Sequence, residues 1–232
     1  AEVPRPCASL TKMMTALLTL EQVKSSPSWH LEREIPVTRA AAQIGGSQVW
    51  LDPRETFTLD ELLKCCLIFS ANDAAYLLAE SLADGEVDAF VERMNRRARQ
   101  NQWNMLKFYN PHGLPEGDAS LDNRGNPLDL ACLAGALLQF PRAVHWSSTR
   151  LDWLREDTDT PTQLLNRNPL VGSVDGVNGM KTGFTNRAGF CIAATCERDG
   201  RVLVAVLMGC PSKDLRLALV KRLLEWGYTT RP

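Results

Sequence analysis

The chain has 232 residues, of which 44% are hydrophobic and 23% charged, a balance that excludes a disordered or collagen-like chain and predicts a packed globular protein. Its 26 Lys and Arg and 27 Asp and Glu leave a formal net charge of −1, without the dense basic run that a nucleic-acid partner would require. The sequence contains no run of roughly 18 apolar residues that would predict a membrane span, and its first ten residues lack a signal-peptide pattern.

The first half of the chain predicts one long helix followed by short strands. Residues 9–23 carry apolar side chains at helical spacing, so we expect a buried helix with Ser9 as its N-cap or in its first turn. Residues 35–57 contain short apolar runs on either side of Gly45 and Gly46, which predicts short strands joined by a tight turn.

Two capping-box patterns predict two further helices. Thr58 is followed three residues later by Glu61, and Ser70 by Asp73. We therefore interpret Ser70 as a capping residue, whatever other role it has. The two predicted helices cover residues 58–69 and 70–83.

The second half predicts more helices and a group of antiparallel strands. The helices cover residues 86–101, 126–140 and 215–227, the loop covers 110–118, and the strands cover 179–185, 189–197 and 201–209. A turn at residues 198–200 joins the last two strands. This order predicts an α/β fold with an antiparallel sheet packed against a helical cluster. Without a Ser- or Gly-rich linker, we expect a single domain over 1–232, with a helical lobe over about residues 25–165.

The seven cysteines do not identify a redox compartment. Their number is odd and no paired-motif spacing appears, so we expect most of them to be small core side chains. The three histidines, His30, His112 and His145, are too far apart in the sequence for metal-ligand spacing, so no metal site is predicted.

Three short motifs together predict a serine nucleophile. Each alone is common or only moderately rare, and an isolated motif would more often be an N-cap, a solvated charge or a strand-end turn. Their occurrence in one chain and in this order carries the signal. The motifs are Ser9-Leu10-Thr11-Lys12, Ser70-Ala71-Asn72 and Lys181-Thr182-Gly183.

Ser9 and Lys12 lie three residues apart on one predicted helix, so their side chains share a face. Lys12 acts as a base only when neutral, a form that burial and the nearby charge of Lys181 would favour. The backbone N–H of Ser9 at the helix start is a candidate oxyanion donor. In the predicted strand, Gly183 leaves room for an extended peptide, and the N–H of Phe184 is a second candidate donor.

Several segments resemble the low-molecular-mass penicillin-binding proteins of the D-Ala-D-Ala carboxypeptidase type. These are CASLTKMMTA, FSANDAAYLLAE and VDGVNGMKTGFTNRAGFCIAA, together with GGSQVWL, NPHGL and LLEWGY. The resemblance implies a β-lactamase/transpeptidase-like fold and a cofactor-free serine peptidase. Such an enzyme removes the terminal D-alanine from peptidoglycan stem peptides through an acyl-enzyme, is acylated by β-lactams, and acts in the periplasm or elsewhere outside the cytoplasmic membrane.

The resemblance also implies residue roles. Ser9 would be the nucleophile, Lys12 the base for the acylation step, with its role in the other steps left open, and Ser70 the proton relay to the leaving amine. Asn72 would hold the substrate amide, Lys181 would tune the field, and Thr182, Thr185 and Arg216 would bind the terminal carboxylate, with Arg167 as a competitor for the last role.

Family members usually carry a signal peptide and about two strands before the nucleophile helix. We expect such strands to come from the full gene product or another chain, because residues 201–209 would otherwise form a bare apolar edge. The C-terminal domain and membrane-binding helix of many relatives do not appear either, which leaves membrane attachment open.

Two other functions are compatible with the same motifs or the same fold. A class A β-lactamase has the same three motifs, but we find no convincing Glu-x-x-x-Asn between Asn72 and Lys181. A non-catalytic peptidoglycan-binding module would keep the fold while its serine is idle.

Overall fold

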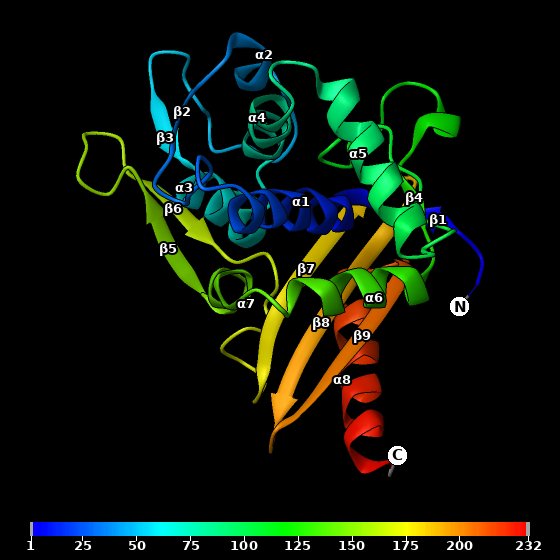
Figure 1. Ribbon diagram of the computed structural model, residues 1–232. Coiled ribbons are helices and arrows are strands. Elements are labelled where there is room, and N and C mark those ends of the chain that lie inside the picture. The colour runs from blue at the N-terminus through cyan, green and yellow to red at the C-terminus, as the bar shows by residue number, and fades with distance from the viewer. Residues whose placement is uncertain (1, 231–232) are drawn as a thin grey trace.

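The computed structural model describes residues 2–230, in which a three-stranded antiparallel sheet has helices on both faces (Figure 1). The strands β7 (Val177–Thr185), β8 (Gly189–Arg198) and β9 (Arg201–Cys210) follow one another in space as in sequence. Helix α8 (Lys213–Thr229) covers one face, and α6 (Pro127–Leu137) and α7 (Pro141–Ser148) cover the other. The three predicted strands, the helices α6 and α8 and the α/β class are confirmed.

Helix α1 (Lys12–Ser25) crosses one end of the sheet, and most of the remaining elements lie around it. The remaining elements are β1 (Arg5–Pro6), the 3-10 turn η1 (Ala8–Thr11), β2 (Glu34–Pro36), α2 (Arg39–Ala42), β3 (Thr56–Thr58), α3 (Leu59–Lys64), the π-helix η2 (Cys65–Phe69), α4 (Asn72–Leu82), α5 (Val87–Gln100), the 3-10 turn η3 (Ala119–Leu121), β4 (Arg124–Gly125), β5 (Leu151–Leu154) and β6 (Thr162–Leu165). Helices α2, α4 and α5 lie on the side of α1 away from the sheet.

Strand β8 has apolar side chains on both faces because it lies between two hydrophobic clusters. Ile192 and Ala194 face α8 and pack with Val220, whereas Cys191 and Ala193 face the cluster around α1. This alternation explains why the strand is apolar along its length. Six of the seven cysteines are buried free thiols, as expected of small core side chains, and Cys132 is exposed.

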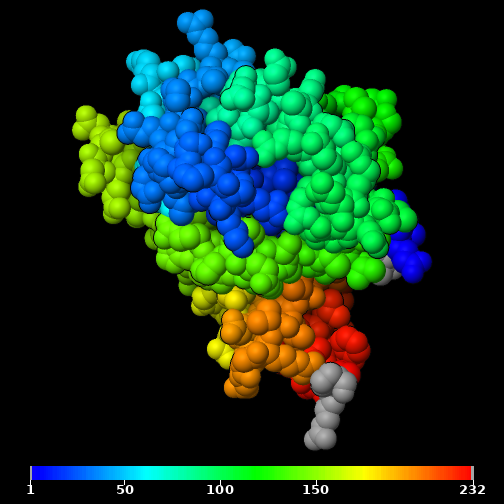
Figure 2. All heavy atoms as spheres, in the orientation of Figure 1, coloured from blue at the N-terminus to red at the C-terminus, as the bar shows by residue number. Residues whose placement is uncertain are grey.

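The β8–β9 hairpin turns at Asp199 and Gly200, which both have positive φ angles (51° and 73°). Such a turn matches the twist of the flanking strands. The space-filling view shows this end of the hairpin extending beyond the helical part, next to α8 (Figure 2). Within residues 2–230, β9 pairs only with β8, so the origin of any strand at its outer edge stays a prediction.

The prediction of short strands in residues 35–57 is confirmed only at the two ends of this segment, and the strand expected next to Gly45 and Gly46 does not form. The strands that form are β2 and β3, which pair with each other from the two ends of this segment, and residues 44–51 form an irregular loop. This loop is held by tertiary contacts, because the buried carboxylate of Asp73 accepts hydrogen bonds from the N–H groups of Val49 (3.1 Å) and Leu51 (3.3 Å).

The same contacts explain why the second capping box was wrong. The carboxylate of Asp73 is engaged by the loop, helix α4 begins at Asn72, and its N-cap is Ala71 without a side-chain cap. Ser70 instead adopts a left-handed conformation (φ 70°) at the end of η2. The predicted helix 58–69 begins as expected but changes to a π-helix at Cys65.

Helix α7 and the hairpin of β5 and β6 were not predicted, and no helix of the described part of the chain is both long and apolar enough to span a membrane.

The capping box at Thr58 is complete: its hydroxyl accepts from Glu61 N (3.2 Å), and the Glu61 carboxylate accepts from Thr58 N (2.8 Å). We predict that Thr58→Ala lowers the free energy of unfolding by about 1 kcal/mol, measured by urea denaturation. The exposed Thr56→Ala is the control and should change it by less than about 0.5 kcal/mol. Equal losses in the two variants would contradict the capping role.

Candidate active site

Ser9 lies in the 3-10 turn η1, directly before helix α1, and its side chain is half-buried. The Lys12 amine (Nζ) lies 3.0 Å from the Ser9 hydroxyl (Oγ). The sequence spacing therefore brings this pair together as predicted. The preceding residue, Ala8, has a positive φ of 47°, an uncommon conformation for a residue with a side chain, so the turn is held by its surroundings.

The Lys12 side chain is fully buried and has two further hydrogen-bond acceptors. Its amine donates to Asn72 Oδ1 (2.6 Å) and to the carbonyl oxygen of His112 (2.8 Å). Burial lowers the pKa of Lys12 from its usual 10.5 to about 8, because the charged form loses its hydration. A lysine with this pKa is neutral in roughly a tenth of the molecules at neutral pH, as a general base requires.

The loop that contains His112 is fixed against the nucleophile turn. Thr15 of α1 donates to the carbonyl oxygen of Pro111 (2.6 Å), and the Asn123 amide links the loop to the Thr11 hydroxyl (3.0 Å). Gly113 has a φ of +86°, and a Cβ added there would lie 2.0 Å from the backbone oxygen of Ala8. The loop can approach Ser9 this closely only with glycine at this position.

Asn72 connects the catalytic lysine to the irregular loop of residues 44–51. Its side-chain N–H donates to the Gly45 carbonyl oxygen (2.8 Å), and its backbone N–H donates to that of Ser47 (2.7 Å). Since the Asn72 side-chain oxygen accepts from Lys12 and its nitrogen donates to Gly45, both ends of this amide are held and its orientation is fixed.

Lys181 is the second buried lysine of the site, with 1% of its side chain exposed. Its amine donates to the Thr182 carbonyl oxygen (2.9 Å). Burial lowers the pKa of Lys181 well below its usual value, and the nearby charge of Lys12 lowers it further. The buried thiol of Cys66 interacts electrostatically with both amines, and burial raises its pKa to about 11, so it stays protonated.

A cleft of about 350 Å³ opens over Ser9. Its lining includes most of the predicted site residues and contains three cationic side chains but no carboxylate. The lining residues are Ser9, Ser47, Ser70, Arg167, Thr182, Gly183, Phe184, Phe190, Lys213 and Arg216. The cleft is therefore suited to an anionic ligand.

Thr182 lines the cleft, whereas Thr185 does not. The Thr185 hydroxyl accepts a hydrogen bond from Ala188 N (3.0 Å) and so belongs to the turn between β7 and β8. Lys181 points the other way, towards Lys12, as alternation along a strand requires.

The structure also gives Gly183 a role that the sequence did not indicate. A Cβ at this position would lie 3.0 Å from Ser9 N and 3.2 Å from the Cys7 carbonyl oxygen. The glycine thus lets β7 lie directly against the nucleophile turn, in addition to any room that it leaves for a ligand.

Two arginines line the cleft. Arg216 is 4% exposed; its Nη1 donates to the Cys191 carbonyl oxygen (3.1 Å), and its buried Nε has no partner among the described residues. Arg167 stacks on the Phe69 ring at 4.1 Å and donates from Nε to the Phe69 carbonyl oxygen (3.1 Å). Arg216 therefore has an unused donor, whereas the Nε of Arg167 is satisfied within the protein.

Sequence reasoning missed three contributors to the site: the carbonyl oxygen of His112, Ser47 and Lys213. The segments GGSQVWL and NPHGL were recognised as family-like, which was the only available signal for the first two. A backbone acceptor leaves no signature in its own side chain, so the role of His112 could not be derived from residue type.

Comparisons with known proteins agree on one family. The sequence model of peptidase S11, D-alanyl-D-alanine carboxypeptidase, matches residues 1–212. The chain is 33% identical over 222 residues to D-alanyl-D-alanine carboxypeptidase DacF of Bacillus subtilis and 32% identical over 229 residues to DacD of Escherichia coli. These alignments cover 96% and 95% of this chain but only 56% of each relative, so the chain spans little more than half of their length.

Solved structures show the same fold. The carboxypeptidase DacD of Francisella tularensis superimposes with a TM-score of 0.89 at 26% identity, covering 98% of this chain and 65% of that one. Penicillin-binding protein D2 of Listeria monocytogenes, in its ampicillin-bound form, gives 0.82 at 27% identity, covering 97% and 88%. The predicted β-lactamase/transpeptidase-like fold is confirmed.

The close approach of Gly113 to Ala8 leads to a stability prediction. Gly113→Ala should lower the free energy of unfolding by at least about 2 kcal/mol, because it adds both backbone strain and a clash with a backbone oxygen. Gly135→Ala is the matched control: an added Cβ meets nothing within 4 Å on helix α6, so the change should be neutral or stabilise by up to about 1 kcal/mol. Urea denaturation of both variants measures the difference, and similar midpoints would contradict the packing argument.

Proposed function

Because this chain belongs to the peptidase S11 family of D-alanyl-D-alanine carboxypeptidases, we propose that it removes the terminal D-alanine from peptidoglycan stem peptides through an acyl-enzyme on Ser9. One observation supports this proposal most: a half-buried hydroxyl lies 3.0 Å from a buried lysine amine, at the floor of a cleft bordered by strand β7. A nucleophile beside a base of lowered pKa is the arrangement that acyl transfer requires.

In the acylation step, the Ser9 oxygen attacks the carbonyl carbon of the peptide bond between the last two D-alanines. Neutral Lys12 takes the hydroxyl proton, and the acceptors Asn72 Oδ1 and His112 O then stabilise the resulting ammonium. These acceptors hold the amine beside Ser9 in either protonation state.

The negative charge that develops on the attacked carbonyl oxygen needs hydrogen-bond donors. We assign this role to the N–H of Ser9 and the N–H of Phe184. No partner of the Ser9 N–H is found within residues 2–230, and Gly183 lies directly against it. Ser70 lines the same cleft and would pass a proton to the departing amine of D-alanine. Water then hydrolyses the ester, releasing the shortened peptide and regenerating Ser9.

The substrate would bind along β7 as an added strand. Asn72 uses one of its two N–H groups on Gly45 and has a second for the substrate amide. Thr182 and Arg216 would hold the terminal carboxylate, since the buried Nε of Arg216 lacks a partner and a guanidinium binds carboxylates in a fixed geometry. Lys181 would contribute a positive field. Thr185, which we also expect to bind this carboxylate, lies at the edge of the site and does not line the cleft.

We also propose that penicillins, which are β-lactams, acylate Ser9. The Listeria relative is described in ampicillin- and cefotaxime-bound forms. Since peptidoglycan lies outside the cytoplasmic membrane, the proposed reaction takes place there.

The central test replaces the nucleophile. We predict that Ser9→Ala lowers the rate of D-alanine release from a pentapeptide at least about a thousandfold and abolishes covalent labelling by fluorescent penicillin. Mass spectrometry of the labelled wild-type protein should place the adduct on the peptide that contains Ser9. The exposed Ser28→Ala is the control and should label like the wild type.

The alternatives give different results in the same assays. A class A β-lactamase would hydrolyse nitrocefin rapidly instead of being acylated slowly and stoichiometrically. A non-catalytic peptidoglycan-binding module would not label covalently at all. Either result would overturn the carboxypeptidase proposal.

The lowered pKa of Lys12 predicts a pH profile. Below about pH 8 the rate of penicillin acylation should rise about tenfold per pH unit, because only the neutral amine accepts the Ser9 proton, and it should level off above that pH. Stopped-flow labelling between about pH 6 and 9 measures this rise in the acylation rate and the plateau that follows it. A flat profile in this range would show that Lys12 is not the base.

A further inference from the structure

A large aromatic side chain lies on the surface beside the catalytic region. Trp50 is 74% exposed, and its backbone is left-handed with a φ of 57°. This conformation is strained for a bulky residue, and such strain persists only where the surroundings fix it. Burying an indole would ordinarily stabilise the fold, so a fixed and exposed one suggests a binding role.

The backbone around Trp50 is held from both sides. The N–H groups of its neighbours Val49 and Leu51 donate to the buried Asp73 carboxylate at 3.1 Å and 3.3 Å. On the other side, the guanidinium of Arg155 donates to the carbonyl oxygens of Val49 (3.0 Å) and Trp50 (3.1 Å). The indole is therefore presented on a rigid loop, which reduces the entropy lost when a ligand stacks on it.

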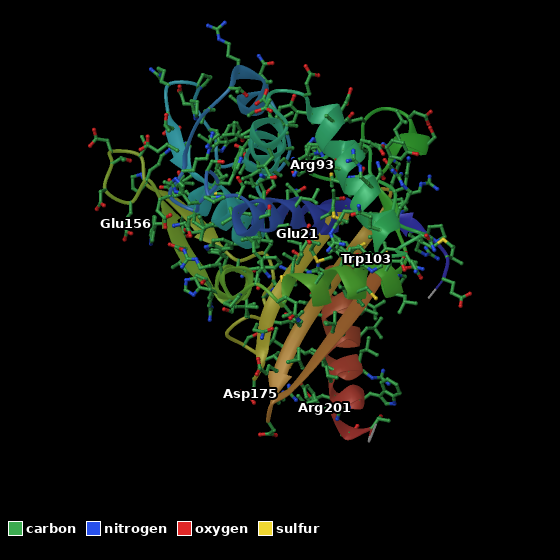
Figure 3. The ribbon with its side chains drawn as sticks, in the orientation of Figure 1. Glu21, Arg93, Trp103, Glu156, Asp175 and Arg201 are labelled. Atoms are coloured by element: carbon green, nitrogen blue, oxygen red, sulfur yellow. The ribbon has the colours of Figure 1, made fainter. Side chains whose placement is uncertain are left out.

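A pocket of about 560 Å³ lies beside the indole, between this loop and the turn that joins β5 to β6. Glu156 in Figure 3 marks that turn, which projects from the body of the protein. The volume lies within the range of small-ligand sites, about 300–1,000 Å³. The pocket is lined by Val49, Trp50, Asp52, Arg54, Glu55, Arg155, Thr160 and Thr162.

The charges of the lining cancel in pairs. Arg54 contacts Asp52 at 2.6 Å, and Arg155 contacts Glu55 at 2.5 Å. The pocket thus offers many hydrogen-bonding groups without net charge, unlike the cationic cleft over Ser9. A neutral ligand with several hydroxyl or amide groups fits such a lining better than an anion or a cation does.

An exposed indole face next to paired carboxylates, guanidinium groups and threonine hydroxyls is the chemistry that recognises carbohydrates. The apolar face of a sugar ring stacks on the indole, and its hydroxyl and acetamido groups find both donors and acceptors. We propose that Trp50 is the stacking residue of a carbohydrate site for the neutral N-acetylated sugars of the glycan strand. This inference rests on the proposed function, since it concerns the polymer that carries the stem peptides.

One loop connects this site with the catalytic cleft. Its first part contacts the catalytic residue Asn72 through the carbonyl oxygens of Gly45 and Ser47, and Ser47 also lines the cleft. Its last part carries Trp50. Binding of glycan at Trp50 would therefore increase the local concentration of stem peptides at Ser9.

The test compares two substrates of the full chain: a free pentapeptide and the same pentapeptide attached to its N-acetylglucosamine–N-acetylmuramic acid disaccharide. We expect Trp50→Asn to lower the ratio of kcat/KM, glycan-linked over free, about tenfold. Asparagine tolerates the left-handed backbone, which protects the loop from collapse. The matched control is Trp226→Ala, a second exposed tryptophan (64%) on α8, which should leave the ratio unchanged.

Direct binding provides a second measurement. The N-acetylglucosamine tetramer should bind protein whose Ser9 is already acylated by penicillin, as measured by isothermal titration calorimetry. Trp50→Phe should retain this binding, and Trp50→Asn should lose it. Equal ratios in the two tryptophan variants, or tetramer binding that Trp50→Asn does not weaken, would overturn the inference. Failure of penicillin to label Ser9 would instead reject the proposed function, so the two failures are distinguishable.

Discussion

A single buried amine organises the site. Lys12 donates to the side chains of Ser9 and Asn72 and to the carbonyl oxygen of His112, which come from three segments far apart in the sequence. A buried ammonium without such acceptors would be very unfavourable. The turn η1, the start of α4 and the loop of residues 110–114 must therefore meet at one point for the fold to be stable and for the lysine to have its lowered pKa.

Three residues around this point have left-handed backbone conformations. Ala8 and Ser70 have positive φ angles without being glycine, and Gly113 has one at a position where Ala8 also leaves no room for a side chain. Strained conformations of this kind persist when surrounding contacts over-determine them, and they often occur at functional sites. Here they allow the nucleophile turn, the Ser70 turn and strand β7 to approach more closely than ordinary helix ends would.

The two pockets differ in charge in a way that matches two parts of one polymer. The cleft over Ser9 has Arg167, Lys213 and Arg216 on its walls, whereas the pocket beside Trp50 is internally neutralised. A peptide terminus carries a carboxylate, and an N-acetylated sugar carries no charge. The loop of residues 44–51 borders both, since Asn72 and Asp73 at the start of α4 hold its two parts.

The sequence by itself determined the elements and motifs that depend on near neighbours. The strands β7 to β9, the helices α5, α6 and α8, the capping box at Thr58 and the pairing of Ser9 with Lys12 follow from periodicity, caps and spacing within a few residues. The order of the three motifs indicated the family, and the comparisons agree. Such local patterns are readable because the interactions that produce them span one turn of helix or one hairpin.

Only the tertiary structure decided what distant partners impose. The Asp73 carboxylate could have capped its own helix but is bound by the backbone of Val49 and Leu51, so Ser70 became a left-handed turn residue. The His112 carbonyl reaches Lys12 across 100 positions of sequence, and Gly183 is required by the approach of Ser9. These contacts depend on which segments pack together, and backbone acceptors and steric room leave no pattern in the residues that supply them.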